Sequence, residues 1–189
     1  LKAALDDHPR KDHRHTIIHA CLPTEEGIRI CDEYGIALAI QSAFIDWPNE
    51  PNEYLESILG DRAVKLNPFK TYADYGIVQA LGSDGPCTDP DPIVWIHKAC
   101  NNGAESLTVQ QALKMCTYNT CWMSFDETER GSLEVGKIAD MVILSGNPYE
   151  TDVRKLDTLK VEQLLLRGEP YKKISQNPIG QVLKGLVRK

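Results

Sequence analysis

Polar side chains follow three apolar runs of the sequence, each at the point where a run ends. His19 closes the first run, Gln41 with Ser42 closes the second, and Asp84 follows the third; the runs span residues 15–20, 35–41 and 77–83. Continuous runs of this length, rich in β-branched residues, indicate strands buried on both faces, as in a parallel sheet. Because functional groups of parallel α/β folds stand at the carboxyl ends of strands, we expect these side chains to share one edge of a sheet.

The chemistry that these residue types suggest is metal-assisted hydrolysis. His19 could donate a neutral imidazole nitrogen and Asp84 a carboxylate oxygen to zinc. Asp84 could also act as a general base toward a metal-bound water. Each residue has a structural alternative: His19 as a core histidine bonded to a neighbouring carbonyl, and Asp84 as part of an ordinary Ser-Asp-Gly-Pro turn.

Other histidine pairs in the sequence carry less weight. His15 and His19 have the spacing of helical zinc sites, but Thr16 stands where a metalloprotease helix has its catalytic Glu. On a strand, these two imidazoles would lie roughly 13 Å apart, too far for one ion. His13 and His15 lie at the strand entry, so we expect a structural or solvated role for them. We expect His97 to be a surface or packing residue.

The order of predicted elements favours an α/β fold. Helices are expected near residues 1–8, 24–34, 54–59, 68–75, 92–101 and 108–115, and they alternate with the three runs, as in a parallel sheet covered by helices. After Asn119 a turn-rich segment and two predicted strands, 139–144 and 161–167, indicate a small β appendage. We therefore predict a partial barrel domain over 1–125, a small β appendage over 126–172, and a C-terminal tail over 173–189.

Composition excludes several classes of protein. The formal net charge of -6 argues against a nucleic-acid binder, which needs a basic face. No apolar run approaches the roughly 20 residues that cross a bilayer, so no membrane association is expected. Residues 1–10 lack the apolar core of a signal peptide, which favours a cytoplasmic protein.

The six cysteines form no C-x-x-C pair, and we expect reduced, mostly buried thiols. The sequence has no phosphate-binding glycine loop, so nothing supports nucleotide binding. It also has no G-x-S-x-G motif, which argues against a serine hydrolase.

Several longer stretches of the chain match one family pattern. Residues 14–20, R-H-T-I-I-H-A, are similar to R-H-R-I-E-H-A, and residues 81–86, L-G-S-D-G-P, are similar to G-S-D-x-P. The most specific match is 131–144, G-S-L-E-V-G-K-I-A-D-M-V-I-L, against G-S-L-E-x-G-K-x-A-D-x-V-x-L. These patterns resemble the amidohydrolase superfamily and, within it, the branch of YtcJ-like amidohydrolases. The resemblance covers nearly the whole chain, 1–172.

The resemblance implies a fold and an activity. It implies a (β/α)8 barrel with an adjoining small β-sandwich, and a metal-dependent hydrolase of C–N bonds in small molecules. It places metal ligands at His19 and Asp84 and gives Asp84 the proton of the hydrolytic water. Arg62, and less strongly Gln41, could position substrate. The cofactor would be a divalent metal, zinc first, although iron or manganese accept the same ligands. The substrate itself stays open.

The chain also departs from the family pattern. Ile18 stands where the family pattern has a Glu, and Ser42 stands where it has a Pro. We therefore expect the substrate pocket to differ from that of the family. The family's H-x-H, its bridging Lys or Glu and its further His have no counterpart here. A full barrel needs ~250 residues, and only about three β/α units fit before the appendage. We therefore expect a C-terminal portion of a longer enzyme, beginning with Leu1 inside a helix, that alone neither holds metal tightly nor turns over substrate.

A second hypothesis is non-catalytic. A three-stranded open parallel sheet leaves unpaired edges and an apolar face that something must cover. The chain could then be a half-barrel remnant that acts as an interaction module and associates with a second copy of itself. In the first hypothesis, the missing N-terminal half would cover the same surface.

Overall fold

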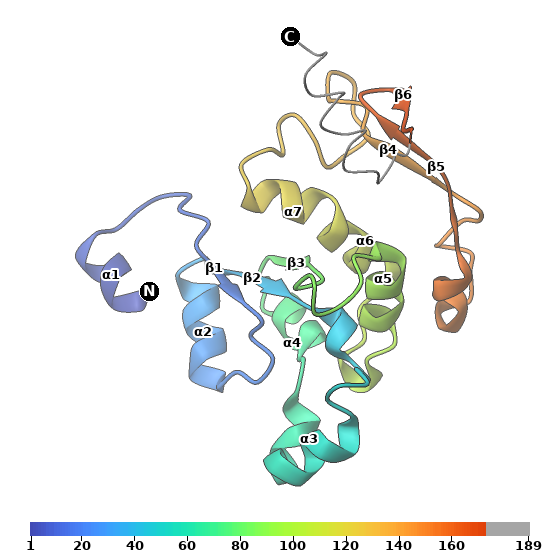
Figure 1. Ribbon diagram of the computed structural model, residues 1–189. Helices are drawn as coiled ribbons and strands as arrows, with labels where there is room; N and C mark the ends of the chain where they lie inside the picture. The colour runs from blue at the N-terminus through green and yellow to red at the C-terminus, as the bar shows by residue number, and fades with distance from the viewer. Residues whose placement is uncertain (173–189) are drawn as a thin grey trace, which may run out of the picture.

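The protein forms two separate β-sheets, and helices pack on the first of them (Figure 1). The computed structural model describes residues 1–172, and the expected C-terminal tail, 173–189, lies outside the described residues. The helices are α1 Lys2–Asp7, α2 Glu25–Glu33, α3 Asn52–Leu59, α4 Phe69–Asp74, α5 Pro92–Cys100, α6 Val109–Cys116 and α7 Tyr118–Met123. Short 3-10 turns are η1 Ser42–Phe44, η2 Gly60–Lys65, η3 Gly103–Glu105 and η4 Val153–Thr158. The strands are β1 Thr16–Ile18, β2 Ala37–Ile40, β3 Gln79–Leu81, β4 Met141–Leu144, β5 Val161–Leu166 and β6 Glu169–Pro170.

The first sheet is parallel, as the sequence predicted. Its order is β1-β2-β3, with Ile17 opposite Leu38 and Ala39 opposite Ala80. Consecutive strands are neighbours, and each is connected to the next through helices, so all three carboxyl ends lie at one edge. This register brings the segments after β1, β2 and β3 together.

The helices begin where capping side chains are available. Thr24 accepts a hydrogen bond from the Gly27 amide at 3.0 Å at the start of α2, and Asp91 accepts from the first turn of α5. Thr108 and Gln111 form a capping box at the start of α6. These side chains satisfy amides that have no partner inside the helix. The predicted helices therefore start within a residue or two of their expected positions.

The core lies between the parallel sheet and the helices packed on it. The largest fully buried side chains are Tyr72, Phe69, Ile36, Leu38, Ile40, Leu156 and Ser42. Most belong to β2 or to helix α4, which explains why the predicted burial of the central strand is correct. Burial of one such large apolar side chain contributes on the order of 2 kcal/mol to the free energy of unfolding.

The expected burial of the first strand is wrong. Ile17 is 37% exposed and Ile18 is 62% exposed. Strand β1 is hydrogen-bonded to β2 on one side and is an edge strand in the described part of the chain. The apolar composition of β1 predicts burial on both faces. In the described part of the chain, β1 pairs with β2 only, and its apolar side chains stay exposed.

The segment after α7 forms a second, antiparallel sheet of order β4-β5-β6. The two strands predicted in this segment are present as β4 and β5, whereas β6, η4 and helix α7 were not predicted. The expected β-sandwich needs two facing sheets, and residues 126–172 supply one. Helix α1 and this sheet lie on opposite sides of the parallel sheet (Figure 1).

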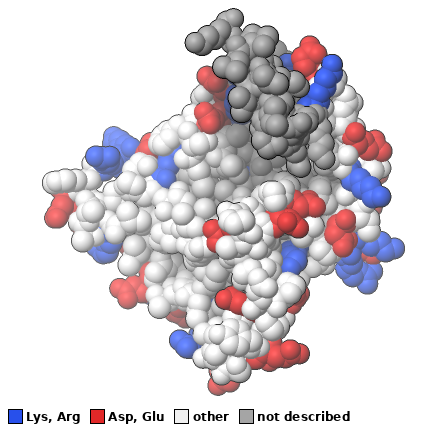
Figure 2. Space-filling view, in the orientation of Figure 1, with Lys and Arg blue, Asp and Glu red and all other residues white. Residues whose placement is uncertain are grey.

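The surface carries charged side chains of both signs. On the face in Figure 2 they are separated by uncharged areas, and acidic side chains also lie near the middle of this face. Among the described residues, no helix has the length and apolar character needed to span a membrane. All six cysteines are free; Cys31 and Cys100 are buried, and Cys87 is exposed. The expectation of mostly buried thiols is thus only partly met.

A buried arginine connects the N-terminal segment to the segment after α7. The Arg14 guanidinium donates to both carboxylate oxygens of Glu127, at 2.8 and 2.7 Å, and to Asp12 at 2.8 Å. It lies over the rings of Trp122 and Phe125, 4.7 and 4.1 Å from their centroids. The proposed domain boundary at 125/126 falls inside this cluster, and that division stays a prediction.

We expect Arg14→Ala to lower the melting temperature by several degrees and the control Arg154→Ala to change it little. The Arg14 side chain is 8% exposed and that of Glu127 17%, whereas Arg154 is 80% exposed in its pair with Asp152, and exposed pairs contribute little. Hydrogen bonds from Arg14 lower the pKa of Glu127. The pair therefore stabilises the fold above the ordinary glutamate pKa, and this stabilisation is lost as the pH falls through the lowered value.

Thermal denaturation over a pH series measures both effects. The difference between wild type and Arg14→Ala should shrink in acid. Equal losses from the two arginine variants, or a difference that is independent of pH, would contradict a role for this buried pair.

Candidate functional site

His19 lies directly after β1, at the carboxyl edge of the parallel sheet. Its backbone amide donates to the Ala39 carbonyl at 2.8 Å, which continues the pairing of β1 with β2 by one residue. Its φ is +73°, in the left-handed region that non-glycine residues seldom adopt. This turn of the backbone ends the strand and directs the imidazole along the sheet edge toward Gln41.

The Gln41 side chain determines how the imidazole is oriented. Its Oε1 lies 2.8 Å from His19 Nδ1, and its Nε2 donates to the Ala39 carbonyl at 3.4 Å. Because an amide oxygen can only accept, the proton of neutral His19 lies on Nδ1 and the lone pair lies on Nε2. Gln41 is 5% exposed, so the acceptor side of this hydrogen bond is shielded from water. An imidazole held in this way is prepared to bind a metal through Nε2.

Asp84 approaches the same point from the turn after β3. Its φ is +52°, and its carbonyl accepts from the Cys87 amide at 2.9 Å, which closes the turn. The Gly82 amide donates to the Ile40 carbonyl at 3.0 Å, which aligns this segment with β2. Left-handed backbone at both His19 and Asp84 stores strain of the kind found at functional sites.

The two side chains converge. His19 Nε2 lies 4.0 Å from Asp84 Oδ2, and the side chains are 47% and 42% exposed. Two ligands of a tetrahedral zinc, each ~2.1 Å from the ion, lie ~3.4 Å apart. A small rotation of either half-exposed side chain closes that difference. The pair fits two positions of a divalent-metal site, and within residues 1–172 no cluster of three potential ligands exists.

A family model described as the amidohydrolase family matches residues 1–171. The chain belongs to the amidohydrolase family. It is 30% identical to the YtcJ protein of Bacillus subtilis over 181 residues, covering 88% of this chain and 34% of that protein. It is 30% identical to the N-substituted formamide deformylase of Arthrobacter pascens over 151 residues, 75% of this chain and 26% of the relative. The chain thus spans about a third or less of these relatives.

The fold of this amidohydrolase chain also has solved counterparts. A zinc-bound adenosine deaminase from Xanthomonas campestris superposes with a TM-score of 0.68 at 22% identity. The match covers 98% of this chain and 44% of that one. At this identity the likeness concerns the fold alone: an α/β arrangement shared with a zinc-bound deaminase.

The remaining predicted site residues lie in different surroundings. The exposed Arg62 side chain lies in η2 and donates to the Leu59 carbonyl at 3.4 Å; the described contacts include none between Arg62 and His19, Gln41 or Asp84. Its substrate role stays a prediction. The Gln41 side chain contacts the His19 imidazole.

The other histidines have the structural contacts expected of them. His13 and His15 stack with ring centroids 4.6 Å apart, and His13 Nε2 lies 2.8 Å from the Tyr34 carbonyl. They lie at the amino end of β1, away from His19. His97 is half-buried on α5, with Nδ1 3.7 Å from Asp157.

Two neighbours of the site carried no signal in the sequence. The ring of Phe44 stacks on His19 with centroids 6.0 Å apart. The Cys87 thiol lies beside Asp84, and its pKa is raised by the loss of some hydration and by the negative charge and hydrogen bond of Asp84. This thiol is therefore protonated at neutral pH. Both contacts depend on how η1 and the turn after β3 fold.

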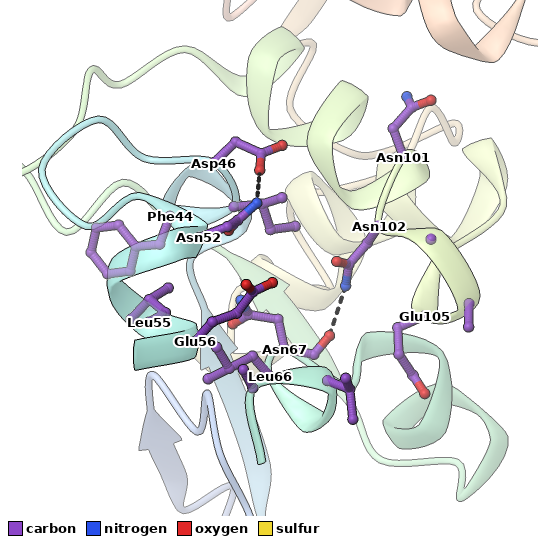
Figure 3. A pocket seen from close by; sticks show the side chains of 15 residues that line it. Phe44, Asp46, Asn52, Leu55, Glu56, Leu66, Asn67, Asn101, Asn102 and Glu105 are labelled. Atoms are coloured by element: carbon purple, nitrogen blue, oxygen red, sulfur yellow. Dashed lines mark hydrogen bonds between the residues drawn. The ribbon is translucent and has the colours of Figure 1, made fainter. Parts of the chain in front are cut away.

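A cavity of about 380 Å³ opens beyond Phe44, between α3, η3 and the loop after β2 (Figure 3). Both polar and apolar side chains line it, and two hydrogen bonds join residues of the lining. Asp46 accepts from Asn52, and Asn102 donates to the Asn67 carbonyl at 2.8 Å. Both hydrogen bonds are drawn in Figure 3. The Asp46–Asn52 hydrogen bond connects the loop after η1 to the start of α3.

We expect Gln41→Leu to change the tautomer of His19. In wild type, neutral His19 should carry its proton on Nδ1, because Oε1 of Gln41 accepts it. Leu has a similar volume but no acceptor, so the ring should lose this preference. Gln41→Glu is the matched control, since a carboxylate oxygen also accepts and should preserve the Nδ1 proton. Imidazole ¹⁵N shifts measure both; an unchanged tautomer in Gln41→Leu contradicts the assigned role.

Proposed function

We propose that this chain carries one wall of the active site of a metal-dependent hydrolase that cleaves C–N bonds. The observation that supports it best is the convergence of His19 Nε2 and Asp84 Oδ2 from two different strand ends, 4.0 Å apart. Membership of the amidohydrolase family supports the same activity. The fold and the family indicate a class of enzyme, whereas the reaction itself must be argued from the residues of the site.

A divalent metal, zinc in the first instance, would be held by His19 Nε2 and Asp84 Oδ2 together with ligands that residues 1–172 do not supply. When bound, such an ion acidifies water and polarises a carbonyl. Gln41 keeps the His19 lone pair directed outward by accepting the Nδ1 proton. The second carboxylate oxygen of Asp84 is the group that would take the proton of the attacking water and return it to the leaving nitrogen.

The architecture that this function needs is a (β/α)8 barrel, of which we propose that β1, β2 and β3 are the last three strands. The parallel order of these strands supports this, as does the placement of the site at their carboxyl ends. The antiparallel sheet of residues 141–170 would be the adjoining small β domain. The exposed edge of β1 would pair with the preceding strand of the barrel.

The substrate class is a small amide or a related C–N compound. The printed name of one relative, N-substituted formamide deformylase, supports this class. Arg62 lies on the long connection that follows β2, and loops after barrel strands are where substrate-positioning groups stand. Gln41 would act on substrate only through His19.

A second candidate function is self-association. Strand β1 exposes Ile17 and Ile18, and the antiparallel sheet exposes Val142, Ile143 and Val161. Apolar surface of this kind is commonly covered by a partner. A non-catalytic module that pairs with a second copy would use the same edge of β1 that a full barrel uses.

Zinc binding tests the first proposal. The chain should bind Zn²⁺ weakly, because it supplies two ligands and a catalytic zinc site has three. His19→Ala and Asp84→Asn should each weaken binding at least about tenfold. Competition with a chromogenic chelator measures the affinity.

His97→Ala is the matched control, since it removes a second His–Asp pair, 3.7 Å apart, outside the site. It should leave zinc affinity unchanged. Equal affinity in wild type and both site variants would overturn the metal assignment. A zinc-independent dimer with that result would favour the self-associating module.

A further inference from the structure

A second cavity, of about 310 Å³, opens beside the candidate metal site. It lies between η1, the turn that carries Asp84, and the first half of α5. Its walls include two indole rings and several small or apolar side chains: Trp47, Trp95, Val94, Ala43, Pro86 and Cys87. This volume lies at the lower end of the range for small-ligand pockets, roughly 300–1,000 Å³.

Hydrogen bonds hold the walls of this cavity in place. The buried Ser42 hydroxyl donates to the Trp95 carbonyl at 2.7 Å, which fastens η1 to α5. Lys98 Nζ donates to the carbonyls of Ala43, at 3.3 Å, and Ile45. The Trp95 indole N–H donates to the Asp89 carbonyl at 3.2 Å. Because these donors already have partners, the cavity offers a ligand its aromatic and apolar surfaces together with the carboxylates of Asp89 and Asp91.

The lining of the cavity adjoins the neighbours of both candidate metal ligands, although neither His19 nor Asp84 is itself part of that lining. On one side, Cys87 lines it, and the Cys87 amide donates to the Asp84 carbonyl at 2.9 Å. On the other side, the rings form a row: His19 stacks on Phe44 with centroids 6.0 Å apart, and Phe44 contacts Trp47 at 5.0 Å. A ligand between the two tryptophans would therefore lie next to the turn that positions Asp84.

We propose that this cavity binds a flat aromatic ring carried by the substrate, so that the amidohydrolase acts on amides with an aryl or arylmethyl substituent. The proposal rests on the proposed function for the reaction but not for the binding of the ring itself. Indole faces prefer stacked or edge-to-face contact with another ring. The carboxylates of Asp89 and Asp91 also line the cavity and disfavour an anionic substituent.

Nuclear magnetic resonance of the indole N–H groups tests this directly, because the chain has three tryptophans. Two of them, Trp47 and Trp95, line the cavity, and Trp122 lies under Arg14. Titration with benzamide should shift the Trp47 and Trp95 signals saturably and leave that of Trp122 in place. Cyclohexanecarboxamide has the same amide and a ring of six carbons that is not flat, and it should bind at least about fivefold more weakly.

Variants separate ring recognition from folding. Trp47→Ala should abolish the saturable shift of Trp95, and Trp47→Phe should retain it, because an aromatic ring is restored. Trp122→Phe is the control and should bind benzamide like wild type. Equal affinity for the two carboxamides, shifts confined to Trp122, or an unaffected Trp47→Ala variant would overturn the proposal.

The outcome is independent of the metal. Benzamide binding that persists in His19→Ala would support the ring pocket even if zinc binding failed. Zinc binding at His19 and Asp84 without any benzamide response would support the hydrolase and remove the ring pocket.

Discussion

The parallel register of β1, β2 and β3 is the constraint on which the site depends. It brings the residues after three separate strands to one edge, although His19 and Asp84 lie far apart in the sequence. Sheet hydrogen bonds continue past the strand ends, from the His19 amide to Ala39 and from the Gly82 amide to Ile40. The positions of the candidate ligands are therefore set by backbone pairing and not by flexible side-chain contacts.

At this edge of the sheet, Gln41 sets the orientation of the His19 imidazole. Its buried amide oxygen accepts from His19 Nδ1, so the imidazole presents Nε2 toward Asp84. A carboxylate in place of Gln41 would add negative charge beside a carboxylate ligand, whereas a neutral amide orients the ring without doing so. The same edge of the sheet is extended by Phe44 and Trp47, which connect the imidazole to an aromatic cavity.

The sequence predicted the parts of this arrangement that follow from local pattern. Apolar runs followed by His19, Gln41 and Asp84 predicted three parallel strands with polar ends, and the sequence also predicted helices that begin near Thr24 and Thr108. It did not predict the exposure of Ile18, because burial depends on what covers an edge strand. The Gln41–His19 hydrogen bond and the contacts of Phe44 and Cys87 were also not predicted, because they depend on turns whose backbone lies in the left-handed region at His19 and Asp84.

The central claim is that one metal ion can be shared by His19 and Asp84. Anomalous diffraction from crystals of the chain soaked in Zn²⁺ tests it most directly, since high zinc concentration reveals weak sites. The account predicts an anomalous peak ~2.0–2.2 Å from both His19 Nε2 and an Asp84 carboxylate oxygen. A peak at the stacked pair His13 and His15, with none between His19 and Asp84, would contradict it.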